Sequence, residues 1–184
     1  MEKLLINTER LQIRNLETKD VEDFYEYRSN PEVAKYQAFD TMTSEQAKHF
    51  ILGQKNKLFG QPGEWVQYGI EEVSMQKLIG DCAVKIDLYD NRMAEIGITI
   101  SPLHQKKGFA KEAMLGILNL LFDIKNLHRV TVMVDVENMA SLKLMKSIGF
   151  RQEAHFIENI FFNGKWGSEI QFAMLHREWK DLPI

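Results

Sequence analysis

The chain has little of several features that would assign it to a class of protein. It contains a single cysteine, Cys82, among its 184 residues, so no disulfide can form within it, which suits a reducing compartment. Its formal net charge of -3 argues against a nucleic-acid binder that relies on bulk positive charge, while permitting a cationic or amine substrate. Its most apolar run, residues 115–124, is too short to span a membrane and is broken by Asn119 and Asp123.

The sequence also lacks internal repeats, low-complexity tracts and any Pro/Gly/Ser-rich linker between two domains. We therefore expect one domain over residues 8–180, long enough to bury a sizeable core. Residues 1–15 contain no long apolar segment and no small-residue cleavage site, so no signal peptide is evident and the cytoplasm is the expected location. No clustered Cys/His pattern suggests a metal, and neither a membrane nor a nucleic acid is expected as a partner.

Hydrophobic periodicity and turn residues predict the order strand, two helices, three strands, helix, strand, helix, two strands. The strand–helix–strand portion should form a parallel, right-handed unit, while turn residues elsewhere indicate antiparallel neighbours. The expected fold class is α/β in the α+β sense, with a central mixed, largely antiparallel sheet and helices on both faces. The predicted elements are strand 10–14, helices capped by Thr18 and Thr43, strands 65–71, 78–88 and 93–100, helix 109–125, strand 129–136, a helix from Asn138 to Gly149, and strands 150–162 and 168–175.

The segment Gln105-Lys106-Lys107-Gly108-Phe109-Ala110 joins a predicted strand to a predicted helix. A helix N-terminus offers unpaired amide hydrogens and a partial positive charge. Gly108 lets the backbone approach a ligand closely, and the two lysines add positive charge, so the segment favours a phosphate or pyrophosphate. It matches neither the P-loop nor the Rossmann fingerprint. The alternative is a solvated surface loop that starts a core helix.

This segment resembles the Q/R-x-x-G-x-G/A motif of the GNAT acetyltransferases, which also follows a strand and opens a helix. Asn138-Met139-Ala140-Ser141, continuing to Ile148-Gly149-Phe150, resembles the second cofactor segment of the same family. The GNAT-like acyl-CoA N-acyltransferase fold is the expectation that follows from the two motifs together.

The two ends of the chain resemble one branch of that family. Residues 8–14, Asp20 and residues 30–33 are similar to the opening of the RimJ/RimL-like branch, whose members acetylate amino groups. Residues 162–166 and 175–179 are similar to its ending, so the resemblance covers about residues 8 to 180.

The resemblance implies acetyl-coenzyme A as the acetyl donor. In this family the strands that correspond to residues 92–100 and 129–136 splay apart, and the pantetheine arm pairs with backbone exposed in the gap. That implies main-chain contacts from Ile98, Thr99 and Ile100, and a pyrophosphate cradle formed by residues 105–110. Asn138 and Ser141 would contact the pantetheine or the sulfur end.

The transfer chemistry needs a neutral amine, although a lysine-like amine has a pKa of about 10.4 and is mostly protonated at neutral pH. A base must therefore remove a proton, directly or through water, and a backbone N–H can stabilise the oxyanion. Glu95 is the candidate base, because acetyltransferases of this kind often carry a glutamate on the strand before the cofactor loop. Glu95 shares one face of the strand with Gly97 and Thr99. The alternative to a catalytic role is that Glu95 is an exposed carboxylate on the strand.

The proton donor to the leaving thiolate is harder to assign. Many relatives place a tyrosine seven residues after the asparagine, but here that position is Met145, whose thioether cannot donate a proton. Ser141 is the candidate substitute, with helix packing or capping as its alternative role. His104 is another titratable group near the loop, but it is expected at the surface. The remaining route is protonation of the thiolate by water.

The acceptor side is predicted from segments that line the acceptor cleft in similar proteins: Arg28, Tyr36, Phe39, Trp65 and Phe156. Most of these aromatic residues are individually better explained as core. The amine can belong to a protein N-terminus, a polyamine, an amino sugar or a small metabolite. Two other hypotheses stay open, a non-catalytic acyl-CoA-binding sensor of the same fold and transfer to an oxygen acceptor. The chain is expected to be a monomer or a homodimer.

Overall fold

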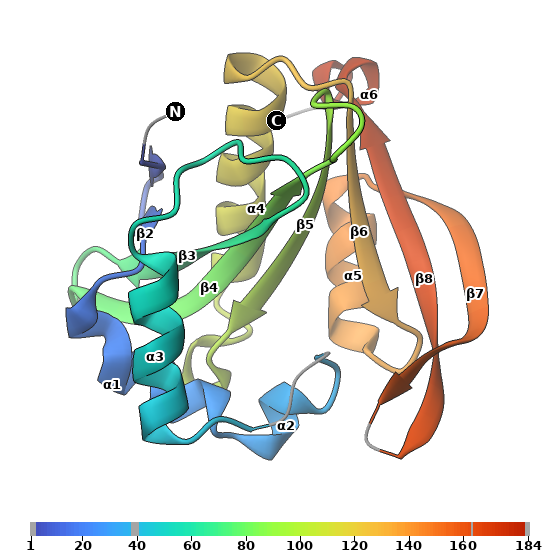
Figure 1. The fold of residues 1–184 in the computed structure, drawn as a ribbon. Coiled ribbons are helices and arrows are strands. Elements are labelled where there is room, and N and C mark those ends of the chain that lie inside the picture. The colour runs from blue at the N-terminus through green and yellow to red at the C-terminus, as the bar shows by residue number, and fades with distance from the viewer. Residues whose placement is uncertain (1–2, 38–40, 163, 183–184) are drawn as a thin grey trace.

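The computed structural model describes residues 3–37, 41–162 and 164–182. In this part of the chain, one eight-stranded sheet has the order β1-β2-β3-β4-β5-β6-β8-β7 (Figure 1). The strands are β1 (Leu5–Asn7), β2 (Leu11–Asn15), β3 (Trp65–Glu72), β4 (Lys77–Ile86), β5 (Met93–Ile100), β6 (Arg129–Asp135), β7 (Arg151–Phe162) and β8 (Lys165–Leu175).

The helices separate the strands in the chain. They are α1 (Val21–Arg28), α2 (Pro31–Ala34), α3 (Ser44–Gln54), α4 (Phe109–Asn119), α5 (Met139–Ile148) and α6 (His176–Lys180), with 3-10 turns η1 (Thr18–Asp20) and η2 (Pro102–His104) and a π-helical turn η3 (Leu120–Ile124).

The pairing of the strands confirms the predicted mixed, largely antiparallel sheet. Only β5 and β6 pair in parallel, and α4 connects them, as expected for the strand–helix–strand unit. All the other pairs between the described strands are antiparallel. The pattern did not reveal β1 and α6, which have three and five residues, because elements this short show no full period of side chains.

Helices cover both faces of the sheet, as predicted (Figure 1). On one face, α4 and α5 pack over the larger core, because apolar residues of α4 such as Ala113, Met114 and Ile117 recur at helical spacing. On the other face, α1 and α3 enclose a smaller core around Phe24 and Ile51. The sheet is therefore the middle layer of three, with a hydrophobic core on each side of it.

Local capping explains where several helices begin. The predicted capping box at Thr43 is present, since Thr43 Oγ1 accepts from the Gln46 N–H at 3.3 Å and Gln46 Oε1 accepts from the Thr43 N–H at 2.8 Å. The expectation that Thr18 caps the first helix is wrong. The chain instead enters α1 through η1, and Glu17 occupies the N-cap position, with Asp20 as its capping partner.

Candidate active site

β5 and β6 pair only at one end. Residues 93–95 of β5 lie beside residues 129–131 of β6, whereas no β6 residue pairs with residues 96–100 anywhere in the described chain. Figure 1 shows the two strands diverging from this point toward the bottom of the view. The splay expected from the resemblance is therefore present.

The register of β4 against β5 decides which backbone groups face the gap. The Ser101 N–H donates to the Ile79 carbonyl at 2.8 Å, and the Asp87 N–H donates to the Met93 carbonyl at 2.9 Å. Odd-numbered residues of β5 therefore direct their backbone groups to β4, and even-numbered residues direct theirs to the gap. Ile98 and Ile100 face the gap, while the backbone of Thr99 faces β4.

A cleft of about 640 Å³ opens beside this gap. Its walls come from α2, the end of β5, the 101–108 loop, the start of α4 and one face of α5. Most of the predicted cofactor residues line it, namely Ile98, Thr99, Ile100, Gln105, Lys106, Gly108, Phe109, Ala110, Asn138 and Ser141. Lys107 is the one predicted cofactor residue that does not.

The loop before α4 is shaped for a close approach of its backbone. Gly108, the N-cap of α4, has φ 85, and Lys106 has φ 61, so both lie in the left-handed region. Gln105 Nε2 donates to the Ile100 carbonyl at 3.0 Å, which fixes the loop to the end of β5. The first N–H groups of an α-helix have no intrahelical partner, so those of α4 are open to an anion in the cleft.

Arg10, which directly precedes β2, contacts this loop and holds it in place. The sequence had not predicted this role for Arg10. Arg10 Nη1 donates to the Lys107 carbonyl at 3.1 Å, and its guanidinium carbon lies 4.5 Å from the centre of the Phe109 ring. Arg10 also forms an ion pair with Glu112, at 2.6 Å. Burial tends to raise the pKa of Glu112, but hydrogen bonds from Thr8 and Arg10 outweigh it and hold that pKa below its usual value. The only available signal was the presence of Arg10 in the segment that resembles the family.

The start of α5 supplies the opposite wall of the cleft. Asn138 Oδ1 accepts from the Ser141 N–H at 3.1 Å, so Asn138 is the predicted helix cap. Ser141 lies one turn into the helix and lines the cleft. Met145, one further turn along, is only 1% exposed and belongs to the large core. The thioether therefore does not substitute in the cleft for the tyrosine of relatives.

His104 is not the surface residue that was expected. It is 9% exposed and lines the cleft, and its buried Nδ1 has no hydrogen-bond partner among the described residues. Burial, followed by the positive charges of Lys107 and Lys77, lowers its pKa. A neutral imidazole is therefore favoured beside the loop that precedes α4.

Glu95 lies in a row with two other side chains across neighbouring strands. Trp65 is the cross-strand partner of Lys85, and Lys85 is the partner of Glu95. Lys85 Nζ is 2.6 Å from Glu95 Oε2 and 4.7 Å from the centre of the Trp65 ring. Glu95 shares the face of β5 that also carries Thr99, but it is not part of the cleft lining.

The remaining predicted acceptor residues lie in three different settings. Tyr36 lines the cleft itself. Arg28 is buried and forms an ion pair with Asp81, at 2.5 Å, beside the hydroxyl of Tyr27. Phe156 is exposed on β7, and Phe39 falls outside the described residues. The structure therefore does not gather Tyr36, Arg28 and Phe156 at one place.

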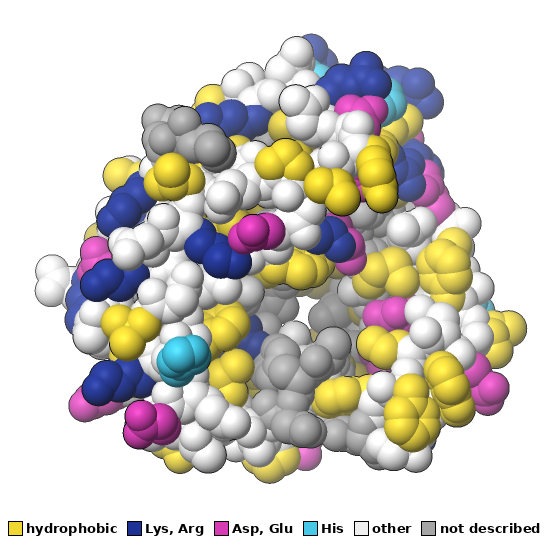
Figure 2. Space-filling model, viewed as in Figure 1, with side chains coloured by type: hydrophobic (Ala, Val, Ile, Leu, Met, Phe, Trp, Pro, Cys, Tyr) yellow, Lys and Arg dark blue, Asp and Glu magenta, His cyan; other side chains and the backbone are white. Residues whose placement is uncertain are grey.

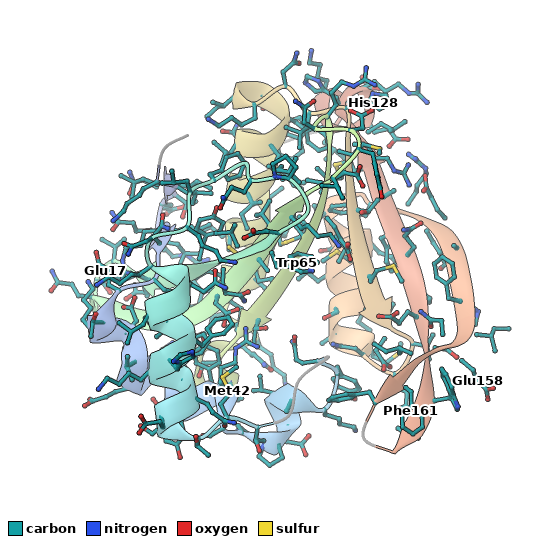
Figure 3. All side chains as sticks on the ribbon, viewed as in Figure 1. Glu17, Met42, Trp65, His128, Glu158 and Phe161 are labelled. Atoms are coloured by element: carbon teal, nitrogen blue, oxygen red, sulfur yellow. The ribbon has the colours of Figure 1, made fainter. Side chains whose placement is uncertain are left out.

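The outer surface around the site is uneven. Figure 2 shows this face hollowed between the helices on one side and the β7–β8 hairpin on the other, with exposed hydrophobic side chains over the hairpin. Figure 3 places Trp65 near the middle of the view and Phe161 and Glu158 toward the far end of the hairpin. Trp65 is thus closer to the centre of this view than Phe161 is.

The cleft has the features that an acyl-coenzyme A needs. It combines unpaired strand backbone, a helix N-terminus with neighbouring lysines, and a partly apolar wall from α5. Within residues 3–37, 41–162 and 164–182, no group of His, Cys, Asp and Glu side chains has an arrangement that suits a metal ion. None of the described helices combines the length and the hydropathy that a membrane span requires.

Comparison with known proteins agrees with this geometry. The family model described as an acetyltransferase (GNAT) domain matches residues 10–151. The chain is 37% identical over 174 residues to the uncharacterized N-acetyltransferase YnaD of Bacillus subtilis (strain 168), covering 95% of this chain and 98% of that protein. It therefore belongs to the GNAT family of N-acetyltransferases and is an enzyme of that class.

Solved structures give the same result. A GNAT-family acetyltransferase from Bacillus anthracis superposes with a TM-score of 0.85 at 28% identity, covering 95% of this chain and 99% of that one. The spermidine N-acetyltransferase from Vibrio cholerae, solved in complex with CoA and spermine, superposes with a TM-score of 0.79 at 26% identity, covering 95% and 100%. The predicted fold is confirmed.

Proposed function

We propose that the protein transfers an acetyl group from acetyl-CoA to a primary amine on a small molecule, by direct transfer in a ternary complex. The observation that carries this proposal is the single cleft in which the open backbone of β5 meets the N-terminus of α4. A pantetheine arm can extend the sheet along Ile98 and Ile100 while the pyrophosphate lies against the loop.

In this proposal, the residues of each wall of the cleft have a separate role in binding or catalysis. Residues 105–110 cradle the pyrophosphate, with Gly108 allowing close approach and Arg10 holding the loop in place. Asn138 and Ser141 contact the pantetheine or the sulfur end. A backbone N–H of β5 that faces the gap stabilises the oxyanion that develops on the acetyl carbonyl.

Glu95 is the proposed base. It lies outside the cleft lining and beside Lys85, so we expect it to remove the amine proton through a water molecule rather than by direct contact. Its place on the same strand face as Thr99 supports an approach of the amine from the side of α1 and α3. Trp65 and Phe156 are proposed to border that approach.

A polyamine is the small amine that we favour as the acceptor. This choice is supported by the relative from Vibrio cholerae whose printed name is spermidine N-acetyltransferase and whose solved complex holds spermine. A protein N-terminus is the second candidate. It is supported by the resemblance of residues 8–14 and 30–33 to the RimJ/RimL-like branch, in which we propose to place the chain.

Three wider expectations remain part of the proposal. The catalytic domain extends over residues 8–180, it acts in the cytoplasm, and it works as a monomer or a homodimer. The lone Cys82, buried in β4, is consistent with a reducing compartment.

The first experiment is thermal unfolding with and without saturating acetyl-CoA, with ATP and NAD as controls. A ligand that binds only the native state raises the midpoint by mass action, so a selective rise with acetyl-CoA supports the donor. Release of coenzyme A is then measured with spermidine, spermine, an amino sugar and a peptide with a free N-terminus. No rise with acetyl-CoA would overturn the donor, and turnover with the peptide alone would overturn the small-amine acceptor.

A further inference from the structure

The reaction needs a proton for the departing thiolate, and α5 does not supply the usual donor. Met145 is buried in the core and its thioether has no proton to give. Ser141 does line the cleft, but an unactivated serine hydroxyl is a weak acid beside a phenol. The proton donor is therefore expected on another wall of the same cleft.

A phenol enters the cleft from α2, on the opposite side from α5. Tyr36 and Gln37 come after Lys35, the C-cap of α2, and both line the cleft together with Ile98 and Ser141. Figure 1 shows α2 lying below the open end of the gap between β5 and β6. Tyr36 is the one tyrosine in the lining of this cleft among the described residues.

The neighbours of Tyr36 fix its position along the cleft. On one side, Gln37 Nε2 donates to Thr99 Oγ1 at 3.1 Å, which ties this segment to the end of β5. On the other side, Tyr36 lines the same cleft as Asn138 and Ser141 at the start of α5. Tyr36 therefore lies between the end of β5 and the start of α5, where the sulfur end of the coenzyme is proposed to sit.

Lys35 gives this phenol a cationic neighbour. Its ammonium lies 5.1 Å from the centre of the Tyr36 ring. Hydrogen bonding to the Tyr36 side chain, followed by attraction to Tyr36 itself, raises the pKa of Lys35.

We propose that the Tyr36 hydroxyl donates the proton to the coenzyme A thiolate, in place of a donor on α5. The amine nitrogen forms a bond to the acetyl carbon while the carbon–sulfur bond breaks. The sulfur leaves with the bonding electron pair and takes the Tyr36 proton, and the amine proton passes through water to Glu95. Tyr36 regains a proton from solvent before the next turnover. This proposal rests on the function proposed above.

The test is Tyr36→Phe, which keeps the ring and removes only the hydroxyl. We expect kcat to fall roughly 100-fold, the lower end of the usual range for general acid catalysis, with little change in KM for either substrate. The rise in unfolding midpoint with coenzyme A should be unchanged. Tyr89→Phe is the matched control, because Tyr89 is 93% exposed and outside the cleft, and it should behave as the unmodified protein does.

Tyr36→His tests the same idea from the opposite direction, since it restores a proton donor but changes the shape. Proton donation predicts that His is faster than Phe, whereas a packing role predicts the reverse. Normal kcat in Tyr36→Phe, a change in KM alone, or loss of kcat only in Ser141→Ala would each overturn the role of Tyr36 while leaving the proposed function intact. Absence of acetyl-CoA turnover in the unmodified protein would overturn both.

Discussion

Lys85 and Glu95 lie directly opposite each other on β4 and β5, with Lys85 Nζ 2.6 Å from Glu95 Oε2. The two side chains are 31% and 27% exposed, so solvent screens their attraction, and pairs of this kind contribute at most about 1 kcal/mol to stability. The pair therefore positions the Glu95 carboxylate more than it holds the sheet together. Because the pair contributes little to stability, a substitution at Glu95 tests its role in catalysis directly.

Glu95→Gln should slow acetyl transfer roughly 100-fold, because the amide cannot accept the amine proton. It should leave the acetyl-CoA-dependent rise in unfolding midpoint nearly unchanged. The measurement is kcat beside the midpoint shift. Glu64→Gln is the control, since it removes one partner of another surface pair, with Lys57 at 3.1 Å, away from the cleft. A normal transfer rate in Glu95→Gln would remove this residue from the mechanism.

Gly108→Glu should weaken coenzyme binding at least tenfold, about 1.4 kcal/mol. The new side chain adds negative charge beside the proposed phosphate position, and its Cβ would lie 3.3 Å from Arg10 Nη2. Because Gly108 has φ 85, part of the effect is backbone strain, so Gly60→Glu at φ 91 is the matched control. Titration of coenzyme A against both variants separates the two causes. Equal affinity in the two variants would contradict the assignment of the loop.

Asp81→Asn should lower the free energy of unfolding by about 3–5 kcal/mol, because it removes the carboxylate from the buried ion pair between Asp81 and Arg28. Urea unfolding measures the change. Asp90→Asn, which breaks a more exposed pair with Arg92, should cause a much smaller loss of stability, because solvent screens that pair. Similar losses in the two variants would mean that the buried pair contributes no more than a surface pair.

Glu71 should make stability depend on pH in the acid range. Burial favours its protonated form, but hydrogen bonds from Arg14 and Lys19 outweigh burial and place its pKa below the usual 4.5. The unfolded chain therefore binds this proton first as the pH falls. The stabilisation is complete above about pH 4.5 and is lost as the pH falls through the lower pKa of the folded state.

The variant that isolates this effect is Glu71→Gln, which cannot titrate. The difference in unfolding free energy between it and the unmodified protein should be largest near neutral pH and shrink below about pH 4.5. Urea unfolding at several pH values measures it. A difference that stays constant down to about pH 3 would show that the pKa of Glu71 is not lowered by folding.

Local patterns in the sequence were enough to locate the parts of the candidate site that are continuous in the chain. β5 was predicted at residues 93–100, and it has those bounds. The segment before α4 and the cap at Asn138 were found because their signals, a glycine at a helix start and an asparagine three residues before a serine, lie within one turn. The order of the elements along the chain followed from hydrophobic periodicity and turn residues.

The sequence by itself therefore determined the fold class, the loop before α4 and the two helices, α4 and α5, that border the cleft. The tertiary structure decided which side chains meet there. Arg10 reaches the loop across 97 residues of chain, Lys85 faces Glu95 through strand register, and Tyr36 enters the cleft from α2 while Arg28 is buried. The physical reason is that such contacts depend on sheet register and helix packing, which place distant residues together and leave no periodic signal in the chain.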